Sequence, residues 1–177
     1  MLTKKDLNLM LDIETLGTNP NAIVLSIGAV FFTKGGLKET FYVELNKEDQ
    51  VSRGRRSTPS TVEWWNTRGI PIPGDASCNN TVVLKQLQEF INDGQIFHGK
   101  DVKVWGNGSS FDVTIMEHLF SIYNIEAPWK FFNVRDVRTI VDLYPKCRPR
   151  EENPHHALED AKNQAKWVIK AMELHGV

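Results

Sequence analysis

The chain of 177 residues has few of the features that mark secreted or membrane-bound proteins. It has two cysteines, Cys78 and Cys147, and neither stands in a cluster with metal-ligand spacing. Reduced thiols in a cytosolic protein are therefore the expected state. No apolar run approaches the roughly 20 residues that a membrane-spanning helix needs. The first ten residues contain a lysine pair but no long apolar segment, so a signal peptide is not expected.

The chain also lacks an excess of charge of either sign. Lys and Arg total 21 and Asp and Glu total 22, which leaves a net charge of −1. A charge this small gives no overall field that would attract nucleic acid or an anionic membrane. Two local basic stretches remain, RGRR at 53–56 and KCRPR at 146–150. They fit solvated loops and phosphate-binding loops equally well, so nucleic acid stays open as a partner.

The length and the ordinary composition predict one domain over residues 1–177. Three consecutive predicted strands, the last two joined by a Gly-Gly turn, indicate an antiparallel meander. Later stretches show helical spacing around one short strand, which predicts an α/β domain with a mixed sheet flanked by helices. The predicted strands are 7–13, 22–32, 37–45 and 101–107; the predicted helices lie within 57–69, 81–93, 109–124 and 153–174; and 129–144 combine a strand or bend with a short helix.

Several helix ends can also be predicted. Gly94 is expected to end the second helix, because glycine commonly follows the last helical residue. Ser109 or Ser110 is the expected N-cap of the third helix. Asn153 is a plausible N-cap for the last helix, where Pro154 suits the first turn.

Two carboxylates interrupt the apolar stretch NLMLDIETLG at residues 8–17. Asp12 and Glu14 lie two residues apart near the end of the predicted first strand, so they project from the same face. Burying two unpaired like charges costs several kcal/mol or shifts a pKa strongly. A positive partner is therefore expected between them.

Three further aspartates stand at positions of interest. Asp112 lies in the first turn of the helix after VWGN, where a carboxylate also suits the helix dipole. Asp160 lies about one turn into the last helix and follows two histidines. Asp136 is flanked by two arginines in VRDVR and is interpreted as structural.

If Asp12, Glu14, Asp112 and Asp160 converge, they carry about four negative charges that two divalent cations would neutralise. Carboxylate oxygen is the ligand that hard ions such as Mg²⁺ and Mn²⁺ prefer. Two such ions, about 3.5–4 Å apart, can clamp the attacking and leaving oxygens of an in-line displacement at phosphorus.

In this order the motifs resemble the DEDD superfamily of 3′→5′ exonucleases, also called DnaQ-like, on the ribonuclease H-like fold. DIET is similar to the first motif, NGSSFD to the second and HHALEDA to the third, over residues 8–172. STVEWW resembles the exodeoxyribonuclease VIII-like branch, which includes bacterial and phage 3′ exoribonucleases. The resemblance implies that the four acids bind the two metal ions.

The superfamily also implies a general base in the third motif. A histidine stands five residues before the last aspartate in one subgroup, and a tyrosine stands four before it in the other. Here both positions are histidine, His155 and His156, and residue type and position agree only for His155. His155 is therefore the expected base, since an imidazole can take a proton from a metal-bound water near neutral pH.

Further expectations concern the substrate. By the same resemblance, Thr15, Leu16 and Gly17 hold the terminal nucleotide. Phe111 is a candidate for stacking on a base. Of the adjacent Trp64 and Trp65, one should pack inward and the other reach the cleft; Trp65 is taken as the substrate contact, although the sequence does not distinguish them.

These expectations add up to a metal-dependent 3′→5′ exonuclease that hydrolyses single-stranded DNA, with RNA as an alternative substrate, to nucleoside 5′-monophosphates. The expected partner is a DNA or RNA strand with a free 3′ end; a homodimer is left open. A non-catalytic binding module would have lost the acids, and all four are present. A phosphatase with an aspartyl nucleophile would leave the histidine motif unexplained.

Overall fold

The computed structural model describes residues 7–148 and 155–175. Within them, five strands form one sheet in the order β3-β2-β1-β4-β5. The first three strands are antiparallel neighbours, whereas β4 and β5 run parallel to β1. This confirms the predicted mixed sheet and its meander. The strands are β1 (Asn8–Thr15), β2 (Val24–Thr33), β3 (Gly36–Glu44), β4 (Lys103–Gly106) and β5 (Val134–Asp136).

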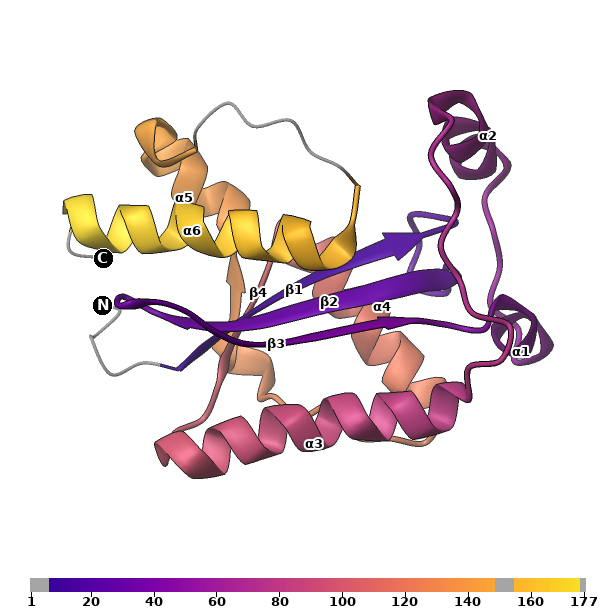
Figure 1. Ribbon diagram of the computed structural model, residues 1–177, viewed down its shortest axis with the longest axis horizontal. Helices are drawn as coiled ribbons and strands as arrows, with labels where there is room; N and C mark the ends of the chain where they lie inside the picture. Colours follow the sequence, from indigo (N-terminus) through magenta and orange to yellow (C-terminus); the bar gives the residue numbers. More distant parts are fainter. Residues whose placement is uncertain (1–6, 149–154, 176–177) are drawn as a thin grey trace.

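Helices cover both faces of the sheet (Figure 1). On one face α6 runs across β1, β2 and β3, with α5 beside it, and α3 and α4 lie on the other face. Two short helices, α1 and α2, lie beyond the end of the sheet where β1 finishes. The helices are α1 (Lys47–Ser52), α2 (Pro59–Arg68), α3 (Asn80–His98), α4 (Ser109–Ile122), α5 (Val137–Leu143) and α6 (Ala157–His175), with 3₁₀ turns at Phe131–Asn133 and Pro145–Cys147.

The alternation of β1 divides its side chains between the two faces. Leu9, Leu11 and Ile13 join the core under α3 and α4, whereas Met10 joins the core under α5 and α6. Asp12 and Glu14 continue the Met10 side of the strand, so they point toward the α6 face. The strand ends two residues later than predicted, which places Glu14 and Thr15 inside it.

The close approach of α6 to the sheet depends on Gly28, which is paired with Asp12 across β1 and β2. A Cβ atom at Gly28 would lie 2.3 Å from the carbonyl carbon of Ala157 and 2.3 Å from the nitrogen of Leu158. The first turn of α6 therefore rests directly on the backbone of β2. Only glycine lets the helix begin this close to the carboxylates of β1.

We expect Gly28→Ala to lower the free energy of unfolding by about 1–3 kcal/mol, because the new methyl group must push the start of α6 away. Urea denaturation followed by circular dichroism measures the change. Gly35→Ala is the matched control, because its nearest neighbour would be Thr33 Oγ1 at 3.5 Å. A Gly28 variant as stable as the control would show that α6 tolerates the displacement.

The prediction that Gly94 ends the second helix is wrong. That helix, α3, continues to His98 and is followed by Gly99 in the left-handed conformation, with φ of 62°. A Cβ atom at Gly94 would lie 2.4 Å from Cζ of Phe31. Gly94 therefore serves close packing of α3 on the sheet, not helix termination.

Caps and loops also differ from expectation in two places. The N-cap of α4 is Gly108 and no side chain caps it, so neither Ser109 nor Ser110 has the predicted role. The predicted caps of the last helix, Asn153 and Pro154, lie outside the described residues. The short helix α1 was not predicted.

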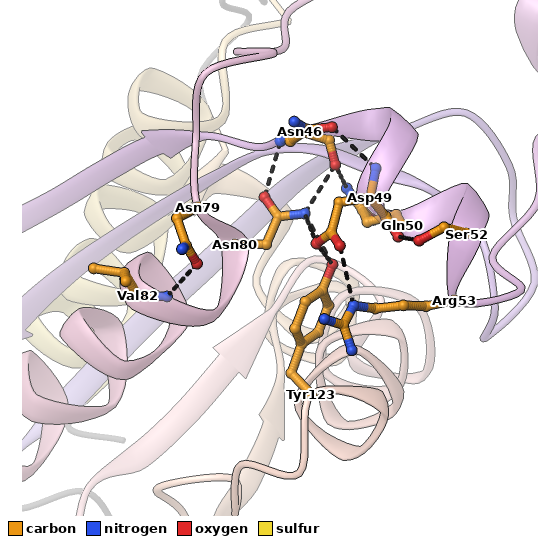
Figure 2. Close-up of polar contacts among 9 residues, drawn as sticks. All are labelled: Asn46, Asp49, Gln50, Ser52, Arg53, Asn79, Asn80, Val82 and Tyr123. Carbon is orange, nitrogen blue, oxygen red and sulfur yellow. Dashed lines mark hydrogen bonds and ion pairs between the residues drawn. The ribbon is translucent and has the colours of Figure 1, made fainter.

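A polar network fastens α1 to the rest of the domain (Figure 2). The Asp49 carboxylate accepts hydrogen bonds from the Tyr123 hydroxyl at 2.6 Å and from the Asn80 amide at 3.1 Å, and it pairs with Arg53. Gln50 is fully buried and bonds to both the N–H and the C=O of Val24. The network thus joins α1 to α3, α4 and the start of β2.

The RGRR stretch is mostly occupied by contacts inside the protein. Arg53 pairs with Asp49 and stacks on the Tyr123 ring. Arg55 is buried, donates to the Ala22 carbonyl and contacts His118 Nδ1. These two arginines are structural, which does not favour a phosphate-binding role for this stretch. In the other stretch, Arg148 lies over the Trp167 ring, and 149–150 lie outside the described residues.

Candidate active site

The carboxylates of β1 lie near the carboxyl end of this central strand, where α6 and α4 both begin. Asp12 Oδ1 accepts a hydrogen bond of 2.7 Å from Nε2 of Gln164 on α6. Glu14 is buried and stands at the bulge where the pairing of β1 with β2 shifts register. The structure therefore places both side chains on one face, as the alternation of the strand predicts.

Asp112 approaches the same place from α4. It lies in the first turn of that helix and is buried. Its carboxylate accepts backbone hydrogen bonds from Ile13 and Asn107, which attach it to the end of β1. A Cβ atom at Gly106 would lie 3.0 Å from the Asp112 carboxylate, so this glycine makes room for the acid.

Asp136 has a structural role, as expected, and its carboxylate accepts hydrogen bonds from backbone N–H groups. One carboxylate oxygen accepts from the N–H of Ser109 at 2.5 Å, and the other accepts from Thr139 at 3.3 Å. It therefore caps α5 and also holds the first turn of α4, the turn that carries Asp112.

Asp160 comes from the first turn of α6 and is buried. Its Oδ1 atom is shielded from solvent and has no hydrogen-bond partner among the described residues. A buried carboxylate oxygen without a donor costs free energy, which is offset when a cation binds it. Ligand atoms of Glu14, Asp160 and His155 lie within 4.8 Å of one another, a spacing that suits one metal ion.

Burial raises the pKa values of all four acids, and the charges of the neighbouring acids add to this effect at Asp12 and Glu14. Burial and the nearby Asp112 hold the pKa of Asp12 well above its usual range. Burial and the charges of Asp160 and Asp112 raise the pKa of Glu14 to about 8. Burial raises the pKa of Asp112 to about 7 and that of Asp160 to about 6. The charge effects at Asp12 and Glu14 show that Asp112 and Asp160 lie near both side chains.

The two histidines before α6 point to different partners. His155 meets the Trp64 ring edge-on at 4.9 Å and lies beside Glu14 and Asp160. His156 stacks on the Tyr42 ring of β3 at 4.5 Å. His155 also has a positive φ of 52°, so its backbone is in the left-handed region. Burial and Arg68 lower the pKa of His155, which favours the neutral form of the imidazole.

A cavity of about 390 Å³ opens beside Glu14 and is bounded by β1, α2 and the start of α4. Phe111 and Trp64 line it, and both are half-buried. Trp65 also borders the cavity but is only 1% exposed, and its indole N–H donates to the Thr15 carbonyl at 2.9 Å. The structure therefore favours Trp64 over the predicted Trp65 as the tryptophan that a ligand would meet.

The turn after β1 is tied to the start of α2. The Thr15 hydroxyl donates to the Gly17 carbonyl at 2.6 Å, and the Leu16 carbonyl accepts from the Thr58 N–H at 2.7 Å. A Cβ atom at Gly17 would lie 2.8 Å from Thr58 Oγ1, which explains the glycine. Thr15 borders the cavity, whereas Leu16 packs with Trp64 and Trp65 in a small apolar cluster.

Three contributors to this site were missed by the sequence analysis: Gly28, Gln164 and Tyr42. Gln164 stands four residues after Asp160, and this helical spacing could have indicated a second polar side chain on the same face. The roles of Gly28 and Tyr42 depend on the exact register of β2 with β1 and β3, which the predicted meander does not specify.

A family model described as the 3′-5′ exoribonuclease Rv2179c-like domain matches residues 7–172. A comparison with proteins of curated function found no match. Among the described residues, no helix has the length and the apolar character needed to cross a membrane.

Solved structures share the fold at low sequence identity. A full-length 3′-exonuclease superposes with a TM-score of 0.70 at 14% identity, over 98% of this chain and 84% of the other. The nuclease domain of 3′hExo, a DEDDh family member bound to rAMP, gives 0.64 at 12% identity over 98% and 94%. Exonuclease I of E. coli in a zinc-bound complex with single-stranded DNA gives 0.68 at 13% identity, over 97% of this chain and 41% of the other. The predicted ribonuclease H-like exonuclease fold is confirmed.

Proposed function

Because the chain belongs to the 3′-5′ exoribonuclease Rv2179c-like domain family, we propose that it removes nucleotides one at a time from the 3′ end of single-stranded RNA. Single-stranded DNA is the second candidate, since one structural neighbour is an exonuclease in complex with it. The products would be nucleoside 5′-monophosphates. We propose that residues 1–177 act as a single exonuclease domain.

The observation that carries this proposal is the meeting of four acids with one histidine; Glu14, Asp112 and Asp160 are buried, and Asp12 is partly buried. Structural carboxylates are usually paired with cations or solvated, because uncompensated buried charge is costly. Here Glu14 has a pKa of about 8, and Asp160 has a buried oxygen without a partner among the described residues. Such strain is typical of a site built to hold something positive.

The donor set fits hard divalent cations. All four acids offer carboxylate oxygen, the ligand that Mg²⁺ and Mn²⁺ prefer. We propose that Asp12, Glu14, Asp112 and Asp160 hold two such ions. When bound, the ions supply charge neutralisation at the phosphate and make the attacking water more acidic.

The residues of the chain would divide the remaining work. His155 accepts the proton of the attacking water, since its imidazole is kept neutral and lies beside Glu14 and Asp160. The cavity beside Glu14 takes the terminal nucleoside, with Phe111 and Trp64 offering ring faces or edges to the base. Thr15 and the turn at Leu16 and Gly17 position its sugar.

Matched oligonucleotides test the proposal. RNA and DNA of one sequence, labelled at the 5′ end, are incubated with Mn²⁺, with Mg²⁺ or with a chelator. A ladder that shortens from the 3′ end, on RNA faster than on DNA and only with metal, is the expected result. A 3′-phosphate should slow digestion strongly. Rapid cutting of closed single-stranded circles would show an endonuclease and contradict the proposal, and a DNA-only ladder would select the second candidate.

The metal-free protein should become less stable as the pH rises from 5 to 8. The pKa of Glu14 is about 8 when folded and near 4.5 when unfolded, so the folded state binds its proton more tightly in this window. Asp112 and Asp160 act in the same direction. The loss should be on the order of a few kcal/mol, measured by thermal unfolding in a chelator. Added Mn²⁺ should raise the melting temperature far more at pH 8 than at pH 5.

Glu14→Gln provides the comparison for this experiment. His118 and His155 have lowered pKa values, so their contribution to the stability of the fold increases as the pH rises. The variant retains this contribution. The difference in pH dependence of stability between wild type and variant is therefore the contribution of Glu14. If wild type and variant show the same pH dependence, Glu14 does not carry the strain that we assign to it.

We also propose a cytoplasmic location, in keeping with Cys78 and Cys147, which are both free thiols. A homodimer stays a prediction, and light scattering of the purified protein would decide it.

A further inference from the structure

Gln164 forms a side-chain hydrogen bond with Asp12, and it is itself almost fully buried. Its Nε2 atom donates to Asp12 Oδ1 at 2.7 Å, and the residue is 2% exposed. Its Oε1 atom is also buried, with no hydrogen-bond partner among the described residues. A buried amide with one half unsatisfied costs free energy, so packing alone does not explain a glutamine at this position.

The position of Gln164 on α6 explains how it reaches Asp12. It follows Asp160 by four residues, about one helical turn, so the two side chains lie on the same face of α6. Gly28 pairs with Asp12 and lets the start of α6 rest on β2. One helix therefore presents an acid and an amide, in successive turns, to the carboxylates of β1.

The chemistry of the contact favours the ionised form of Asp12. The Asp12 carboxylate lies among three other acids and resists ionisation, and the amide donor of Gln164 opposes that effect. A glutamine brings a hydrogen-bond donor without a charge, so it neither competes with a cation nor pairs off the acid. A lysine or arginine at this position would neutralise Asp12 instead.

We propose that Gln164 is a positioning residue that holds one oxygen of Asp12 and so orients the carboxylate toward the metal ions. This inference rests on the proposed function of the four acids. Hydrogen-bond partners of metal ligands typically contribute about 10- to 100-fold to metal affinity or activity.

The test is Gln164→Met, which keeps the length and approximate volume of the side chain but removes its donor. The first readout is binding of Mn²⁺ alone, followed by the rise in melting temperature as Mn²⁺ is added. We expect the apparent dissociation constant for Mn²⁺ to rise at least about 10-fold. Asn163→Ala, on the same helix with a surface contact to Lys166, should leave it unchanged.

The second readout separates positioning from a structural defect. In the exonuclease assay the metal activation curve of Gln164→Met should shift to higher concentration, and saturating metal should restore part of kcat, while KM for the oligonucleotide stays the same. A fold defect would instead lower activity at every metal concentration. Gln164→Asn, whose amide is one methylene short of Asp12, should behave like Gln164→Met.

The outcomes distinguish this inference from the proposed function. Wild-type Mn²⁺ affinity in the folded Gln164→Met protein overturns the positioning role, even if the wild type digests RNA as proposed. A wild type that digests neither RNA nor DNA overturns the proposed function, while weakened Mn²⁺ binding in the variant would still support the role of Gln164. A misfolded Gln164→Met protein with a folded, wild-type-like Gln164→Asn would also count against it.

Discussion

Asp12→Asn is expected to abolish exonuclease activity and, at the same time, to make the metal-free protein more stable. Activity should fall by at least about 10³-fold, because a neutral amide cannot replace a carboxylate that stabilises charge in the transition state. The melting temperature in a chelator at pH 8 should rise by about 2–4 °C for each kcal/mol of repulsion removed. Opposite changes in activity and stability identify a residue retained for function.

The sign of the stability change follows from the raised pKa of Asp12. A carboxyl whose pKa is higher in the folded state than in the unfolded state destabilises the fold at pH values above its ordinary pKa. Removing the charge should therefore help at pH 8 and have little effect at pH 4. The variant should also lose most of the Mn²⁺-induced rise in melting temperature.

Asp136→Asn is the matched control, since the same substitution is made at an acid that accepts hydrogen bonds from the backbone N–H groups of Ser109 and Thr139. Asparagine has one carbonyl oxygen, so it can still accept one of these two hydrogen bonds, and Asp136 is not one of the four acids. The metal response should therefore persist. An Asp12→Asn protein that keeps most of its activity, or that is no more stable than wild type in chelator, would contradict the assignment.

Asp12 and Glu14 could be singled out from the sequence because charge is anomalous in an apolar strand, whereas Asp112 and Asp160 were assigned from the order of the motifs. Two residues that stand two apart in a strand project from the same face, so Asp12 and Glu14 were expected to lie together. Asp112 and Asp160 came from the second and third motifs. The helix that carries Asp160 was also evident from its spacing. These features are local, so the sequence alone reveals them.

What the sequence did not reveal depends on contacts between distant segments. Gly94 has the appearance of a helix terminator, but Phe31 packs against it and α3 continues. Trp64 and Trp65 are neighbours in the sequence. The indole N–H of Trp65 donates to the Thr15 carbonyl, so Trp65 packs inward and Trp64 lies nearer the cavity. No local pattern indicates why residue 28 must be glycine. The reason is the close contact with α6, a helix that begins about 130 residues later in the chain.

The expected effects of substituting the two histidines also follow from contacts between distant segments. His155→Ala should lower kcat by about 10²–10⁴-fold, because a positioned general base typically contributes that much. His156→Ala should cost less than about 10-fold, since its ring stacks on Tyr42 and does not join the acid cluster. Steady-state kinetics on a labelled oligonucleotide at saturating Mn²⁺ measure both.

His155→Gly is the control for backbone strain. A φ of 52° is unfavourable for alanine but not for glycine, so the glycine variant should be the more stable of the two. If the alanine variant fails only because its backbone is strained, the glycine variant should recover activity. If the imidazole is needed as the base, both should be equally impaired.

The pH profile and the Mn²⁺ affinity distinguish a general base from a metal ligand at His155. The acidic limb of the pH–rate profile should change in the His155 variants, because that limb reports protonation of the base. Their Mn²⁺ affinity should stay close to that of the wild type, since the four acids supply the ligands. A large loss of Mn²⁺ affinity would make His155 a metal ligand with Glu14 and Asp160, and severe impairment of His156→Ala would move the base to the tyrosine-type position.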